Sequence, residues 1–117
     1  MQRELLLLEE LAEAAEQAHR LVAGVSLQAL VEDRVLRDAL LWNFTVLGEA
    51  ASQLPSEFTS RHPQVPWRQP VRLRNRIVHG YWSIDLEILH TTAQSQLPEF
   101  AAEVRRILAT LTDTITD

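Results

Sequence analysis

Residues Arg72 to Tyr81 gather side chains that can move protons and bind negative charge. These ten residues contain three arginines, an asparagine, a histidine and a tyrosine. When RNA is cleaved without a metal, the 2′-hydroxyl loses a proton to attack the phosphorus, and the leaving 5′-oxygen gains one. Histidine changes its charge near neutral pH and can transfer these protons, while arginine can stabilise the charge on the phosphorane. Asparagine and tyrosine can orient phosphate or base by hydrogen bonding. The residue types therefore suffice for this reaction.

The helix expected over residues 67–79 places these side chains on different sides. At about 100° per residue, one stripe carries four polar or charged side chains, those of Arg72, Asn75, Arg76 and His79. Arg74 lies about 140° from His79, so one straight helix cannot easily bring both to one phosphate. Either the helix distorts near Gly80 or a second copy of the chain completes the site, and we favour the second copy. The alternative for His79 is a helix-terminal histidine that bonds a final carbonyl.

The charge of the chain is distributed unevenly. The net charge is −5, every basic residue is arginine, and residues 61–83 contain five arginines and no acid. The remainder carries six arginines against sixteen acidic residues and is therefore net −10. Arginine presents a planar set of donors that fits phosphate. The acid-free stretch indicates local anion recognition, or else arginines that are neutralised by acidic helices of the same fold or of a partner.

The composition and the hydrophobic periodicity predict an all-α protein. A chain of 117 residues with three glycines and scattered β-branched residues offers few strands or tight turns. Apolar residues at three- and four-residue spacing predict a bundle of four to five antiparallel helices. The expected helices cover residues 2–22, about 28 or 32 to 54, 67–79, 86–95, and the chain from 96 or 97 onward. No repeat or linker interrupts the pattern, so residues 1–117 are expected to form a single domain.

Proline and glycine mark the expected helix ends. Pro55 ends the second helix, and residues 55–66 are expected to be a loop. Pro70 is compatible with the third helix only within its first turn, where a missing N–H costs little. Gly80 is expected to follow that helix with a left-handed backbone.

The second long helix has an unusually broad apolar face. One seam contains Leu36, Leu40, Phe44, Leu47, Ala51 and Leu54, and the other contains Val35, Ala39, Trp42, Val46 and Ala50. Such a helix is either central to the bundle or packed against another chain. Glu49 follows Trp42 by seven residues and shares its seam. We expect this carboxylate to form an ion pair with an arginine of the acid-free stretch, the alternative being a catalytic role.

Several classes of protein are disfavoured by what the sequence lacks. It has no cysteine, which excludes disulfides, thiolate metal sites and a cysteine nucleophile. No apolar run approaches the roughly 20 residues that cross a bilayer. The leucine run near the N-terminus is flanked by charges, unlike a signal peptide. We therefore expect a cytoplasmic protein with no membrane contact, no metal site and no cofactor.

The segment Arg74-Asn75-Arg76-Ile77-Val78-His79-Gly80-Tyr81 resembles the Arg-x4-His motif of HEPN domains. Its ending, His-x-Tyr, is typical of HepT-like proteins. Gly48-Glu49-Ala50 is similar to a signature of the same family, as are Pro66-Trp67 before the motif and Ile84-Asp85 after it. The resemblance covers nearly the whole chain. Pro70 departs from the pattern, since an ordinary helix former is expected there.

The resemblance implies a function and a set of roles. HepT-like toxins are metal-independent endoribonucleases that work as homodimers, with both motifs lining one cleft. On this basis Arg74 stabilises the phosphate, His79 is the general acid or base, and Asn75 supports the site. Arg72, Arg76 and Glu49 are candidates for substrate binding or support. The usual partner is a MntA-like nucleotidyltransferase antitoxin that transfers AMP to the motif tyrosine, here Tyr81.

Two alternatives stay open at this point. The chain could be a non-catalytic HEPN module that binds nucleotide or a nucleotidyltransferase through its arginine face. The negative net charge and the absence of lysine favour that alternative. Tyr81, for its part, could be a tyrosine that simply packs after the helix.

Overall fold

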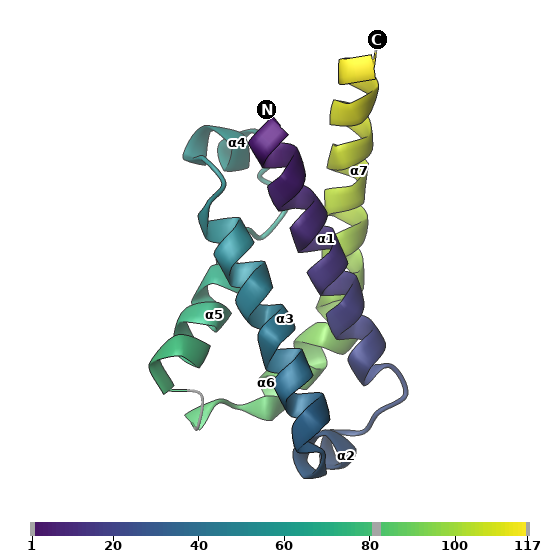
Figure 1. Cartoon of the computed structure of the whole chain (residues 1–117), viewed down its shortest axis with the longest axis vertical. Coiled ribbons are helices and arrows are strands. Elements are labelled where there is room, and N and C mark those ends of the chain that lie inside the picture. Colours follow the sequence, from purple (N-terminus) through teal and green to yellow (C-terminus); the bar gives the residue numbers. More distant parts are fainter. Residues whose placement is uncertain (1, 81–82, 117) are drawn as a thin grey trace.

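The fold is a bundle of helices, as the sequence predicts. The computed structural model describes residues 2–80 and 83–116, and these residues contain no strand. The principal helices are α1 (Gln2–Val22), α3 (Arg34–Ser52), α5 (Arg68–Gly80) and α7 (Leu97–Thr116). Helix α1 packs against both α3 and α7, and α5 packs on the far side of α3. Neighbours along this row run antiparallel (Figure 1). No described helix combines the length and the apolarity needed to cross a membrane.

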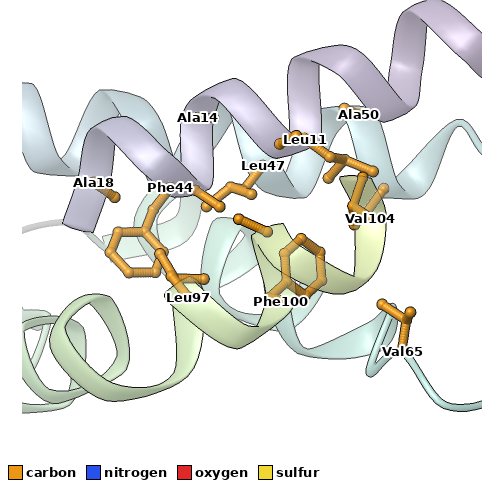
Figure 2. Packing of buried hydrophobic residues seen from close by; sticks show 14 of the residues in the cluster. Leu11, Ala14, Ala18, Phe44, Leu47, Ala50, Val65, Leu97, Phe100 and Val104 are labelled. Carbon is orange, nitrogen blue, oxygen red and sulfur yellow. The ribbon is translucent and has the colours of Figure 1, made fainter. Parts of the chain in front are cut away.

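The core lies where α1, α3 and α7 meet. Figure 2 shows Leu97, Phe100 and Val104 of α7 facing side chains of α1 and α3, with Val65 contributed by the segment before α5. The first seam of α3 is buried as predicted, with Leu36 only partly covered. Burial of these side chains is the main force holding the helices together.

The second helix expected from the sequence is divided into two. A short helix α2 (Leu27–Glu32) precedes α3, and Asp33 separates them with an extended backbone. The Asp33 carboxylate accepts a hydrogen bond from Leu36 N at 3.1 Å, which caps α3. Ser26 caps α2 in the same way through Ala29 N. Each cap satisfies a backbone N–H that has no partner within its helix.

The proline-rich segment is also more ordered than expected. Residues predicted as a loop contain helix α4 (Ser56–Arg61). Phe58 anchors this helix because its side chain is buried and packs edge-on against Trp67, with ring centroids 5.9 Å apart. The Trp67 indole donates to the carbonyl of His62 at 2.9 Å. Aromatic packing therefore provides a tertiary contact that periodicity could not reveal.

The last part of the chain is one helical run instead of two helices. Helix α6 (Leu86–Thr91) continues through a π-helical segment, η2 (Thr92–Gln96), into α7. Pro98 follows the wide turn, and a proline ring clashes with the carbonyl four residues earlier in a regular helix. The widened segment avoids that clash. The Ala93 carbonyl within it contacts the ring nitrogen Nδ1 of His19 at 3.1 Å.

Helix α5 begins and ends close to its predicted bounds. Pro70 is the third residue of the helix and is buried, which agrees with its expected place in the first turn. Gly80 is wrongly predicted as a left-handed residue after the helix, because it lies within α5. Among the described residues, a positive φ occurs at Gly24. The Ser83 hydroxyl donates to the Gly80 carbonyl at 2.9 Å, so this terminal carbonyl is satisfied without a left-handed turn.

Candidate functional site

The site begins with a close contact between α3 and α5. Gly48 is buried in α3, and Arg74 crosses directly over it. A Cβ at Gly48 would overlap the Cβ of Arg74 and would lie 2.6 Å from the Pro70 carbonyl oxygen. Only glycine leaves room for the two helices at this distance. This packing fixes the point at which the Arg74 side chain leaves α5.

The Arg74 guanidinium is held at the surface of α3. Its Nη2 lies 3.3 Å from the Glu49 Oε2, and its Nη1 donates to Asn75 Oδ1 at 3.1 Å. The structure thus contains the ion pair between Glu49 and an arginine of the acid-free stretch that the sequence predicts. The Nε atom of Arg74 is buried and has no hydrogen-bond partner in the described part of the chain.

His79 lies beside a separate pocket at the end of α5. The pocket has a volume of about 430 Å³. Its lining comes from α5, from the segment before α6 and from α6 itself: Leu73, Arg76, Ile77, His79, Gly80, Ser83, Ile84, Asp85, Ile88 and Leu89. Five of these side chains are aliphatic and four are charged or polar, while Gly80 contributes backbone. Asp85, which belongs to the Ile84-Asp85 part of the family signature, both caps α6 through Glu87 N and lines this pocket.

The predicted stripe on α5 is divided between two hollows. Arg76 lines the pocket that contains His79, whereas Arg72 lines a groove beside Arg68 and Trp67. Arg74 lines neither of them, as its position on the helix predicts. Tyr81, the predicted modification site, lies outside the described residues.

The second seam of α3 is only partly covered in the single chain, since Ala50 is buried and Ala39 and Val46 are half-buried. Val35 is 81% exposed and Trp42 is 66% exposed, although both are large and apolar. Trp42 and Glu49 line a shallow groove of about 250 Å³ between α3 and α1. Glu49 therefore connects Arg74 to the exposed apolar surface that the sequence predicts as a possible contact with another chain.

Sequence reasoning missed some residues of the site. Gly48 was noted only within a signature, although a glycine in a broad apolar helix is a signal of close helix contact. Ser83 carried no signal, because its role depends on its contact with the Gly80 carbonyl in the folded chain. In residues 2–80 and 83–116, no three histidine, aspartate or glutamate side chains are grouped as metal ligands would be.

The arrangement in one chain separates two chemical tasks. Arg74 presents positive charge on the α3 side of α5, and His79 presents an imidazole to the pocket on another side. His79 and Arg76 are both exposed, so a ligand can reach them. The chain can therefore bind an anion at one place and transfer a proton at another.

Comparison with known proteins identifies relatives over most of the chain. A family model described as Ribonuclease HepT-like matches residues 11–107. A protein from Caldanaerobacter subterraneus subsp. tengcongensis, whose name describes it as a candidate RNase, is 33% identical over 87 residues. That match covers 74% of this chain and 78% of the relative.

An archaeal relative extends the match further. A protein from Thermococcus cleftensis, described as a probable ribonuclease HepT, is 26% identical over 100 residues, covering 86% of this chain and 91% of the relative. No solved structure matches the chain. The matches agree with the resemblance inferred from the sequence motifs.

Proposed function

This chain belongs to the ribonuclease HepT-like family, and we propose that it is a metal-independent endoribonuclease toxin of a toxin–antitoxin pair acting in the cytoplasm. The names of its relatives support a ribonuclease. The proposal is carried by one observation in this chain: a motif helix that presents Arg74 and His79 separately, next to an uncovered apolar surface.

The roles of the side chains follow from their chemistry. His79 would act as general acid or base on the 2′-hydroxyl or the leaving 5′-oxygen, because imidazole transfers protons near neutral pH. Arg74 would stabilise the phosphorane. The Arg74 side chain is one-third exposed and engages Glu49 through one nitrogen, so other N–H donors of its terminal nitrogens remain for phosphate. Asn75 would hold the guanidinium in place through its hydrogen bond.

We further propose that the working unit is a homodimer. Arg74 and His79 face different sides of α5, so a site within one chain is incomplete. The exposed seam at Val35 and Trp42 is an apolar patch of the kind that marks a protein contact. A two-fold axis would repeat the same surface on both copies. Arg74 of one copy would then meet His79 of the other at one phosphodiester.

Paired inactive variants test both the activity and the shared site. We expect Arg74→Ala and His79→Ala each to lower RNA cleavage by about 100-fold or more while the dimer stays folded. Differently tagged copies of the two variants, co-expressed and purified as a mixed dimer, contain one intact shared site. Their cleavage rate should recover to roughly half that of the wild-type dimer. A mixed dimer without activity would place both residues in one chain, and a wild-type dimer that leaves RNA intact would refute the ribonuclease.

Regulation by a MntA-like nucleotidyltransferase antitoxin is the second part of the proposal. Transfer of AMP to Tyr81 would add bulk and negative charge two residues after His79, where it would compete with RNA phosphate. Co-expression with the antitoxin should add the mass of one AMP to the wild type and nothing to Tyr81→Phe. The variant should also stay toxic in the presence of the antitoxin. An unchanged mass gain on Tyr81→Phe would contradict the assignment.

One observation favours a non-catalytic module instead. Arg74 is already paired with Glu49, and an arginine neutralised in this way has less affinity for a phosphate. Such a module would bind nucleotide or a nucleotidyltransferase through the arginines of α5. Expression without the antitoxin separates the two functions, because only the ribonuclease is expected to be toxic, and His79→Ala should remove that toxicity.

A further inference from the structure

The pocket beside His79 has an apolar floor that the proposed catalytic roles do not use. Leu73 and Ile77 contribute to it from α5, and Ile84, Ile88 and Leu89 contribute from the segment that follows. Its volume of about 430 Å³ falls within the range typical of sites for small ligands. Aliphatic walls of this kind can cover the face of a flat ring.

The polar groups that line this pocket come from two segments of the chain, α5 and the segment before α6, and the two segments differ in chemistry. Helix α5 supplies Arg76 and His79, whose N–H donors suit a phosphate. The segment before α6 supplies Ser83 and Asp85. A ligand that contacts both segments therefore needs an anionic group for α5, a flat apolar part for the aliphatic walls, and a polar edge for Ser83 and Asp85.

Ser83 and Asp85 present acceptors to such an edge. The Ser83 hydroxyl gives its only hydrogen to the Gly80 carbonyl, so it can offer a ligand only lone pairs. Asp85 Oδ1 accepts from Glu87 N at 3.0 Å, which leaves the second carboxylate oxygen for another donor. The edge of the ligand should therefore carry N–H groups.

We propose that this pocket binds a base of the RNA beside the bond that is cut, and that it prefers bases with an exocyclic amino group. Adenine, cytosine and guanine carry that group, which supplies two N–H donors. Uracil has a single ring N–H between two carbonyls, so it can satisfy only one of the acceptors of Ser83 and Asp85 and turns a carbonyl toward the other. This inference rests on the proposed ribonuclease function. It adds the substrate preference of the same site.

Cleavage of a pool of short RNAs with randomised positions tests the preference. At one position next to the cut bond, the wild-type dimer should favour an amino-bearing base over uracil by about tenfold. Asp85→Asn should reduce that ratio to about threefold or less, because it adds a donor while asparagine still caps α6. Ile88→Ala should weaken selection by opening the apolar wall. Val78→Ala is the matched control, because Val78 is exposed on α5 and does not line the pocket.

Binding of mononucleotides tests the pocket without relying on cleavage. In spectra of the full chain with labelled isoleucine methyls, cytidine monophosphate should shift Ile77, Ile84 and Ile88 and leave the core residue Ile107 unchanged. Uridine monophosphate should shift them less. Inorganic phosphate, which can reach Arg76 and His79 but has no base, should leave Ile84 and Ile88 unchanged. If RNA stays intact but these shifts occur, the ribonuclease fails and the base site stands. Equal cleavage at all four bases, or no shift with cytidine monophosphate, overturns the base site.

Discussion

Arg105 and Arg74 each join two helices through carboxylates, but they are held very differently. Arg105 of α7 donates from all three guanidinium nitrogens to α1. Its Nε and Nη2 reach the two oxygens of Glu16 at 3.1 and 2.8 Å, and its Nη1 reaches Glu9 at 2.7 Å. This two-carboxylate contact ties α7 to α1 across one edge of the core.

Arg74 makes fewer contacts at the other edge of the bundle. One nitrogen meets Glu49 at 3.3 Å, another donates to the neighbouring Asn75, and Nε is buried without a partner in the described chain. Each terminal nitrogen of Arg74 has one partner and carries a second N–H that a phosphate could use, whereas Arg105 would have to lose three hydrogen bonds first. The number of satisfied donors therefore distinguishes an arginine that holds the fold from one that can act on a ligand.

Of the changes that test this comparison, the largest loss of stability should come from the contact between Gly48 and Arg74. Gly48→Ala should lower the free energy of unfolding by about 2 kcal/mol or more, because its Cβ meets backbone and α5 must move away. Urea unfolding measures the change. Gly80→Ala is the matched control, since among the described residues its Cβ would meet only the hydroxyl end of the Ser83 side chain, at 3.0 Å. The control should change stability by less than about 1 kcal/mol. Equal losses in both variants would show that the α3–α5 contact is not specially tight.

A smaller loss of stability is expected at Arg105, the arginine with more hydrogen bonds. Arg105→Met keeps the length of the side chain but removes its donors, and should cost about 1 kcal/mol because the contact is partly exposed. RNA cleavage should stay unchanged. Arg106→Met provides the control, since Arg106 is more exposed and its ion pair with Glu103 lies within its own helix. A loss of cleavage in Arg105→Met with normal stability would break the distinction between the two arginines.

The smallest effect is a dependence of stability on pH. The hydrogen bond from Arg105 is the main cause that lowers the pKa of the Glu16 carboxyl in the folded chain. The resulting stabilisation is complete above the ordinary glutamate pKa of about 4.3, and is lost as the pH falls through the lowered pKa. We expect a few tenths of a kcal/mol, because both partners are partly exposed. Urea unfolding of the wild type and of Arg105→Met between pH 6 and 3 should show this loss only in the wild type.

Periodicity predicted the long helices well because each buries a single stripe of apolar residues. The bounds of α1 agree with the prediction, and the buried seam of α3 is correct. The exposed seam at Trp42 was identified as unusual, but the sequence could not separate burial in the fold from contact with another chain. The ion pair of Glu49 was predictable because a carboxylate on an apolar seam needs a cationic partner, and the acid-free stretch supplies five arginines.

The remaining features depend on single local interactions. The break at Asp33 is decided by one cap, and helix α4 is stabilised by the packing of Phe58 on Trp67. The π-helical segment follows from Pro98 only when the run from α6 to α7 is known to be continuous. The pocket beside His79 could not be predicted, because it depends on where the fold places Ser83 and Asp85 relative to α5.

The placement of α5 at the edge of the bundle has a dynamic consequence. Its substantial helix contact is with α3, and its fully buried residues are Pro70 and Gly80. A helix with so little buried surface can detach and re-form without unfolding the three-helix core. Its amide protons should therefore exchange with solvent sooner than those of α1. The segment that carries the proposed chemistry would then be more adaptable than the core helices α1, α3 and α7. A ligand or partner that contacts α5 would act in part by keeping this helix in place.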